Sequence, residues 1–360
     1  MKIAINIPLV DKEEITAVTS ILRNGVLTSA ANQGGKHVQI FEKSVSSFVK
    51  SKYVIAVNSG TAALQAALYA LDIGPGDEVL VPSFTFVATA NAVVSTGAKP
   101  IFVDILKENF TIDPDDLQKK ITKKTRAIIP VHLYGNVSNI ERLDEISKKY
   151  NLPIIEDAAQ SLGSTYKRKH TGTFFDMGCF SMYPAKVMTS GEGGFIVTNN
   201  KKLRDKLLMI RNHGMVHGYD TKIFGLNLRL SEINAAIATV QMKKLPKFLK
   251  IRKNNANFLS KLLSDLNIQL PQQQKNENVN WYLYTITTKQ RNSFVKKLNE
   301  KGIGAVSYYP TPVHKTPFYK LKTNLPITDW ASKHVVSLPI HPKVTKTNIE
   351  FIAKTIHDIL

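Results

Sequence analysis

One lysine of this chain stands where covalent chemistry is feasible. Lys186 follows Pro184 in a loop and precedes a glycine-rich turn, Gly191-Glu192-Gly193-Gly194. A lysine held away from water has a lowered pKa, and its neutral amine can form a Schiff base with an aldehyde. The chain has 39 lysines, so Lys186 is informative only through its neighbours, among them the hydroxyl of Ser181 five residues earlier.

A carboxylate closes an apolar run further back. Residues 154–161 read IIEDAAQS, so that Asp157 falls at the carboxyl end of an expected strand and small residues follow it. Ligands of open α/β sheets bind at these strand ends. Asp157 is therefore a candidate partner for a cationic ring nitrogen. Taken alone, Asp157 is better explained as a helix N-cap or a surface acid.

Two further segments suggest a phosphate and a flat ring. Residues 58–61, NSGT, open an alanine-rich helix, where free N–H groups and hydroxyls form an anion site. An ordinary N-cap would use the same residues. Phe84 and Phe86 follow an expected strand at 78–82, where an aromatic side chain can stack on a planar ligand. Core packing would explain either phenylalanine by itself.

Together the four segments specify a ligand with a phosphate, an aromatic ring carrying a protonated nitrogen, and an aldehyde. Pyridoxal 5'-phosphate has these three features. A dinucleotide is not expected, because no GxGxxG follows an early strand. A metal is not expected either, because no cluster of His, Cys and carboxylates has zinc spacing.

The elements that must position these residues alternate between strand and helix. Short β-rich runs at 78–82, 100–103, 127–131, 153–156 and 195–198 are interspersed with helical patterns such as 61–71 and 140–150. This alternation predicts an α/β fold with a mostly parallel sheet flanked by helices. The pattern changes near residue 242, which predicts a large domain at 1–241 and a small α+β domain at 242–360. A basic helix near the boundary is expected to break at Pro246.

Composition limits the remaining function classes. The net charge is +20, but only nine of the 48 basic residues are arginine, which favours a solvated surface over specific nucleic-acid recognition. A polyanion-binding regulator remains an alternative. The single cysteine, Cys179, excludes an intrachain disulfide. No apolar run has transmembrane length, and charges follow soon after the start, so we expect a cytoplasmic protein without membrane insertion.

Longer motifs carry a resemblance that covers almost the whole chain. In order, they are NSGTAAL at 58–64, PSFTF at 82–86, VHLYG at 131–135, EDAAQ at 156–160, YPAK at 183–186, GEGG at 191–194, RNHG at 211–214, GLNLR at 225–229 and SLP at 337–339. The sequence resembles the DegT/DnrJ/EryC1/StrS family of sugar-nucleotide aminotransferases, which have the fold-type I architecture and depend on pyridoxal phosphate. The resemblance implies that Lys186 holds the cofactor as an internal aldimine and shuttles a proton between Cα and C4′.

The resemblance also implies roles for the other positions. Asp157 would pair with the pyridinium nitrogen, Gln160 would reach the phenolic oxygen and Phe86 would stack on the ring. The phosphate would be bound by Gly60, Thr61 and Ser181. Asn227 resembles the residue that family members send into the neighbouring subunit's phosphate site, which implies a homodimer with shared active sites, and Arg229 is a weaker candidate for substrate contact.

Lysine at position 186 also indicates the reaction. A dehydratase branch of the family carries histidine there, so lysine favours transamination. The expected reaction moves an amino group from glutamate, or glutamine, to a nucleotide-linked keto sugar through a pyridoxamine phosphate form of the cofactor. A keto-cyclitol or another ketone is the alternative acceptor. Residues 29–37 depart from the family pattern near the sugar pocket, and Tyr309 and His314 would line the pocket or pack within a loop.

Overall fold

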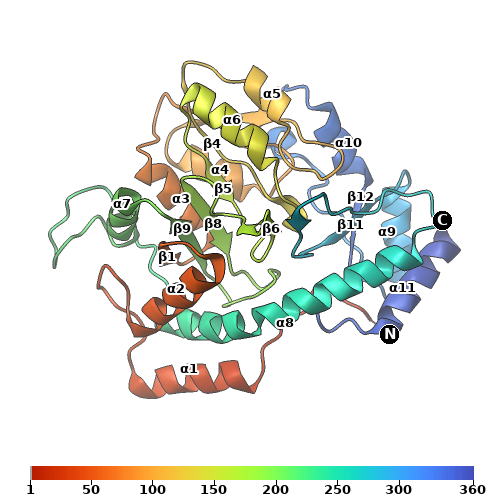
Figure 1. Cartoon of the computed structure of the whole chain (residues 1–360), viewed down its shortest axis with the longest axis horizontal. Helices are drawn as coiled ribbons and strands as arrows, with labels where there is room; N and C mark the ends of the chain where they lie inside the picture. Colours follow the sequence, from red (N-terminus) through yellow and green to blue (C-terminus); the bar gives the residue numbers. More distant parts are fainter. Residues whose placement is uncertain (1) are drawn as a thin grey trace.

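The computed structural model describes residues 2–360 and is built around a seven-stranded sheet. Two hydrogen-bonded groups, β3-β2-β4 and β5-β8-β9-β1, are joined by parallel bridges from Ile128 to Ile154 and from Val131 to Asp157. Only β9 runs antiparallel to its neighbours. The strands are β1 (Tyr53–Val57), β2 (Glu78–Pro82), β3 (Lys99–Val103), β4 (Thr125–Ile128), β5 (Ile155–Asp157), β8 (Met177–Ser181) and β9 (Gly194–Thr198). The mostly parallel α/β sheet predicted from the sequence is confirmed (Figure 1).

Helices cover both faces of this sheet because its strands are apolar on both sides. In β1, Ile55 and Val57 face a core shared with α3 (Gly60–Ala70), α4 (Ala88–Ser95) and α7 (Lys201–Arg211). The alternate residues Val54 and Ala56 face a second core with α2 (Lys36–Val49) and α8 (Glu232–Leu262). Near β4, α5 (Pro114–Lys119) and α6 (Ile140–Tyr150) cover a third core. The short β6 (Thr165–Tyr166), β7 (Lys169–His170) and β10 (Glu277–Asn278) form a small ribbon.

The C-terminal part has a core of its own. It packs β11 (Tyr284–Thr287) and β12 (Val335–Leu338) against α9 (Arg291–Glu300), α11 (Lys346–Ile359) and the end of α8. The helix α10 (Pro326–His334) precedes β12, and both chain ends lie on this side (Figure 1). Ile3 belongs to the same core and pairs with Ile303. The predicted boundary at 241/242 falls inside α8, so the domain division stays a prediction.

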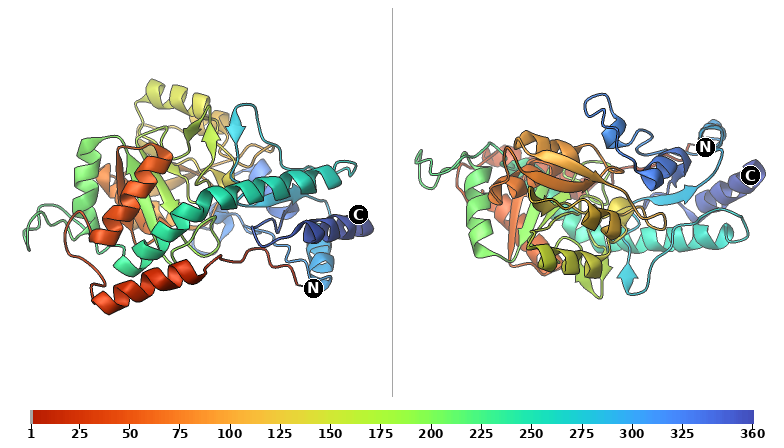
Figure 2. Two further views of the ribbon diagram at one scale, coloured as in Figure 1. Left: turned by 60° about the horizontal axis from the view of Figure 1, so that its bottom comes forward. Right: turned by 90° about the horizontal axis from the view of Figure 1, so that it is seen from above.

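The predicted break near Pro246 is wrong. Helix α8 runs through this residue from the large sheet to the C-terminal core, as Figure 2 shows. Met242, Leu245 and Phe248 are buried on one side of the helix, whereas Pro246 is exposed. A proline inside a helix removes one backbone hydrogen bond and crowds the preceding turn, which costs about 3 kcal/mol. The free energy gained by burying this apolar face outweighs that cost.

Candidate active site

The predicted site residues gather at one edge of the sheet. Asp157 ends β5 and Ser181 ends β8, and these strands are parallel neighbours. Residues 58–61 follow β1 directly, and 83–86 follow β2. Since the carboxyl ends of parallel strands meet at one edge, the fold brings together segments that are far apart in the sequence.

The start of α3 forms an anion cradle. Ser59 is its N-cap, and the Oγ of Ser59 accepts a hydrogen bond from the Ala62 N–H at 3.0 Å. Within residues 2–360, the N–H groups of Gly60 and Thr61 have no hydrogen-bond partner. A Cβ on Gly60 would lie 2.7 Å from the Cβ of Ser181, so only glycine lets the helix start approach that hydroxyl so closely. Free N–H groups, a helix N-terminus and a nearby hydroxyl suit a phosphate group.

Asp157 is a buried carboxylate that accepts hydrogen bonds on both of its oxygens. Its Oδ2 accepts a hydrogen bond from Thr89 Oγ1 at 2.8 Å, and its Oδ1 accepts one from the Ala159 N–H at 3.2 Å. Thr85 lies 3.1 Å from Thr89, hydroxyl to hydroxyl. Burial raises the pKa of Asp157, while the Thr89 hydrogen bond opposes that rise most strongly. Such a carboxylate is stabilised in its charged form when a cation pairs with it.

The strand end that carries Asp157 is fixed by its buried neighbour Glu156. One carboxylate oxygen of Glu156 accepts from Gly172 N–H at 2.6 Å and the other from Phe174 N–H at 2.7 Å. His132 Nε2 is 3.0 Å from Glu156, and His132 Nδ1 accepts a hydrogen bond from the Ser138 N–H, which places the ring proton on Nε2. This support was not predicted from the sequence, although His132 lies within the VHLYG motif.

Lys186 lies beside the ring of Tyr282 and is influenced by the charge of the buried Asp157. Its Nζ is 5.0 Å from the ring centre of Tyr282. Burial lowers the pKa of Lys186 to about 8, and the charge of Asp157 acts in the opposite direction. The loop is tied down by Asn6, whose Nδ2 donates to the Pro184 carbonyl at 3.1 Å, while Arg252 donates to Asn6 and to the Tyr282 carbonyl. Tyr282 was likewise not predicted as a site residue, because the sequence shows it only as one of several aromatic residues in WYLY at 281–284.

We expect covalent loading of an aldehyde at Lys186 to depend on pH with a midpoint near 8. With a pKa of about 8, about a tenth of the amine is neutral at pH 7, against about 0.03% for an ordinary lysine of pKa 10.5. Because the pKa is lowered, the neutral, reactive fraction rises as the pH passes through 8. Stopped-flow absorbance of pyridoxal phosphate binding between pH 6 and 9.5 measures this rate. A rate that still climbs tenfold per pH unit above pH 9 would show an unperturbed lysine.

The two phenylalanines after β2 have different surroundings. Phe84 is fully buried and contacts Phe110, Tyr134 and Tyr309, so it is a core residue. Phe86 is 59% exposed at the edge of the site, where its ring is free to stack on a ligand. Burial therefore assigns Phe84 to the core and leaves Phe86 as the candidate for stacking on a ligand, a distinction that the sequence alone does not make.

Gln160 is held on both sides of its amide. Its Oε1 accepts from the Tyr134 N–H at 2.9 Å, and its Nε2 donates to Tyr309 Oη at 3.0 Å. Burial raises the pKa of Tyr309 well above its ordinary value. Tyr309 is therefore connected to the site by its hydrogen bond with Gln160. His314 is buried, and its Nδ1 lies 2.7 Å from Ser83 Oγ.

Asn227 and Arg229 occupy a segment beside the end of β1. The Asn227 side chain is exposed, and its carbonyl accepts from Asn58 Nδ2 at 3.2 Å. Arg229 pairs across from Val57, and its Nη1 donates to Asn212 Oδ1 at 2.7 Å instead of reaching the Lys186 loop.

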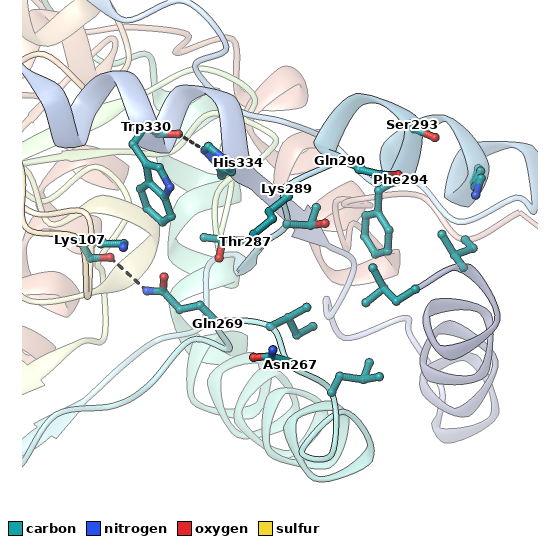
Figure 3. Close-up of a pocket in the computed structure, with 16 residues that line it drawn as sticks. Lys107, Asn267, Gln269, Thr287, Lys289, Gln290, Ser293, Phe294, Trp330 and His334 are labelled. Carbon is teal, nitrogen blue, oxygen red and sulfur yellow. Dashed lines mark hydrogen bonds between the residues drawn. The ribbon is translucent and has the colours of Figure 1, made fainter.

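A separate hollow lies in the C-terminal part of the chain. It has a volume of about 650 Å³ and lies between Lys107, Gln269, Trp330 and the start of α9 (Figure 3). None of the predicted site residues lines it. Among residues 2–360, no group of three or more His, Cys, Asp or Glu side chains is arranged to hold a metal, and no helix is long and apolar enough to cross a membrane.

Comparisons with known proteins agree with this geometry. The model of the DegT/DnrJ/EryC1/StrS aminotransferase family matches residues 8–357. The chain belongs to this family. It is 36% identical over 340 residues to the dTDP-3-amino-3,4,6-trideoxy-alpha-D-glucose transaminase of Streptomyces venezuelae, covering 93% of this chain and 90% of the relative. It is 33% identical to a protein of Geobacillus stearothermophilus named pleiotropic regulatory protein, covering 98% of each.

A solved structure bears on the cofactor. The pyridoxal-phosphate form of a putative sugar aminotransferase from Streptococcus pneumoniae superimposes with a TM-score of 0.93, covering 100% of each chain at 26% identity. The fold-type I architecture predicted from the sequence is confirmed, and so is the aminotransferase class. The family depends on pyridoxal phosphate, and the cradle at Gly60, the buried Asp157 and the low pKa of Lys186 fit that cofactor.

Proposed function

We propose that the chain is an aminotransferase that moves the amino group of L-glutamate to a nucleotide-linked keto sugar. The observation that carries this proposal is the meeting, at one sheet edge, of a phosphate cradle, a buried carboxylate and a lysine of lowered pKa. The names of the relatives support the nucleotide-linked keto sugar as the acceptor class. A keto-cyclitol is the second candidate acceptor, because residues 29–37 depart from the family pattern.

Each residue of the site has a role in this proposal. Gly60, Thr61 and Ser181 would bind the cofactor's phosphate, Asp157 its ring nitrogen, Gln160 its phenolic oxygen and Phe86 its face. When bound, the cofactor supplies an electron sink for the carbon that loses its proton. Lys186 would hold the cofactor through Nζ and then, as a neutral amine, accept the proton from the donor's Cα and return one to the product.

We also propose that two copies of the chain complete each site. Phe86, after β2, is 59% exposed, and Tyr183, in the Lys186 loop, is 52% exposed, which leaves an open side of the site for a second copy to cover. Asn227 would then reach the partner's phosphate cradle as a further donor. A cyclic dimer uses the same surface of both copies, so both sites would be completed in the same way.

Turnover tests the proposal directly. The protein loaded with pyridoxal phosphate is incubated with L-glutamate and, separately, with UDP-, GDP- and dTDP-linked keto sugars and a keto-cyclitol. We expect one nucleotide-linked sugar to gain an amine, seen by mass, with an equal amount of 2-oxoglutarate. If only the keto-cyclitol is aminated, the acceptor is a keto-cyclitol and not a nucleotide-linked keto sugar. No turnover together with tight, cofactor-independent DNA binding at moderate salt would favour a regulator, as the +20 charge allows.

A further inference from the structure

The hollow in the C-terminal part of the chain is large enough for a small ligand, and the proposed chemistry does not use it. Its volume of about 650 Å³ lies within the range of about 300–1,000 Å³ that is typical of small-molecule sites. Lys107, from the loop after β3, lines one side, while α10 and the first turns of α9 line others (Figure 3). An occupant would therefore contact both the loop after β3 and the C-terminal elements.

One wall of the hollow is aromatic. The rings of Trp330 and His334, one turn apart on α10, stack with their centres 5.0 Å apart and their planes 18° from parallel. Lys107 Nζ lies 4.7 Å from the centre of the Trp330 ring. Because Lys107 is exposed, this contact is weaker than the stacking of a base on an aromatic side chain. A planar ring can therefore take the place of the ammonium on the indole and leave that ammonium for an anionic group.

The rim of the hollow is cationic. Lys107, Lys289 and Lys297 line it, and within residues 2–360 none of their ammonium groups has a hydrogen bond or an ion pair. No Asp or Glu side chain of the described residues lines the hollow. Lysine ammonium groups are common ligands of phosphate in proteins. The charge of the rim therefore favours an occupant that carries phosphate.

Amide groups also line the hollow. The side chains of Asn267 and Gln290 are exposed there and make no hydrogen bond to any other residue in the range 2–360. Each amide offers donors and an acceptor, which match the hydrogen-bonding edge of a nucleobase. An acyl chain would displace water from these amides without replacing its hydrogen bonds. The lining thus favours a nucleotide over a lipid phosphate.

We infer that the hollow is a second ligand site, which binds a nucleoside diphosphate with its base against Trp330 and its phosphates at Lys289 and Lys297. This inference goes beyond the proposed transamination and does not depend on it, because no residue proposed for the Lys186 site lines the hollow. Inorganic pyrophosphate shares the anionic part of this chemistry but lacks the ring. Uridine has the ring but lacks the phosphates, so the two compounds test the wall and the rim separately.

The experiment measures UDP binding by the fluorescence of Trp330. The chain has two tryptophans, and Trp281 is buried and does not line the hollow, so Trp281→Phe leaves Trp330 as the only indole. We expect UDP to quench this fluorescence, and pyrophosphate and uridine each to compete with UDP about tenfold more weakly or worse. Lys289→Ala/Lys297→Ala should weaken UDP binding about tenfold or more, because charged hydrogen bonds to phosphate are lost.

A matched pair of lysines controls for surface charge. Lys296 and Lys301 are exposed at the same helix and do not line the hollow, so Lys296→Ala/Lys301→Ala removes the same charge and should leave the affinity for UDP nearly unchanged. Equal losses in the two pairs would overturn the inference, because general surface charge would then hold UDP. Equal affinities for UDP and pyrophosphate would also overturn it, because the ring would then have no role.

Equilibrium dialysis counts the sites without any change at Trp281. Lys289→Ala/Lys297→Ala should bind one UDP fewer per chain than the unchanged protein, while Lys186→Ala should keep this site. An equal count in the lysine pair and the unchanged protein would contradict the inference. Loss of transamination in every variant together with a normal UDP count would reject the proposed function and leave the second site in place.

Discussion

Replacement of Lys186 by alanine is expected to abolish transamination, with kcat falling about 10⁴-fold or more. The change removes both the covalent attachment of the cofactor and the amine that moves the proton, and general acid–base catalysis alone contributes about 10²–10⁴-fold. Turnover of glutamate to 2-oxoglutarate measures the loss. Borohydride reduction followed by peptide mass should label the unchanged protein at Lys186 and leave the variant unlabelled.

The control must show that the loss does not come from misfolding. Lys247 is an exposed lysine of α8 and has no role in the proposed site, so Lys247→Ala should keep full activity. Lys186→Ala should keep the thermal transition within a few degrees, because the Lys186 side chain belongs to none of the apolar cores. A Lys186→Ala variant with more than a tenth of the normal kcat would contradict the assignment.

The sequence was sufficient for most of the architecture because its signals there are local. Short apolar runs and helical patterns predicted β2, β3, β4, β5 and β9 and the helices α3 and α6, and the end of β5 predicted the place of Asp157, whereas β1 and β8 were not predicted. The proline rule failed at Pro246 because the burial of Leu245 and Phe248 is a tertiary effect. No window of the sequence shows which face of a long helix the rest of the chain covers.

The site itself was only partly visible in the sequence for the same reason. The residues with unusual chemistry, Lys186 and Asp157, stand in recognisable motifs. The residues that tune them do not: Thr89 reaches Asp157 across 68 positions, and Tyr282 approaches Lys186 from the C-terminal part. An ordinary threonine or tyrosine becomes informative only after the fold has placed it within hydrogen-bonding or stacking distance of the site.

Replacement of Asp157 by asparagine is the second change with a large expected effect. The amide keeps the size of the side chain but cannot balance a protonated ring nitrogen, so the cofactor loses its electron-withdrawing charge in a buried site. Thr89, which now donates to the carboxylate at 2.8 Å, would still find the amide oxygen. We expect kcat to fall about 10²–10³-fold, the usual cost of one missing electrostatic partner in an active site, with a smaller loss of cofactor affinity.

Rescue by a modified cofactor shows whether charge is the cause. N-methylated pyridoxal phosphate carries a permanent positive charge on the ring nitrogen, so it no longer needs a carboxylate to keep a proton there. With this cofactor, the kcat of Asp157→Asn should rise at least tenfold over its value with pyridoxal phosphate, while the kcat of the unchanged protein should not rise. Thr89→Val should show a milder loss, about tenfold, because it removes only the hydrogen bond that favours ionised Asp157. Equal activity of Asp157→Asn with either cofactor would mean that the carboxylate supports the strand end and does not act on the ring.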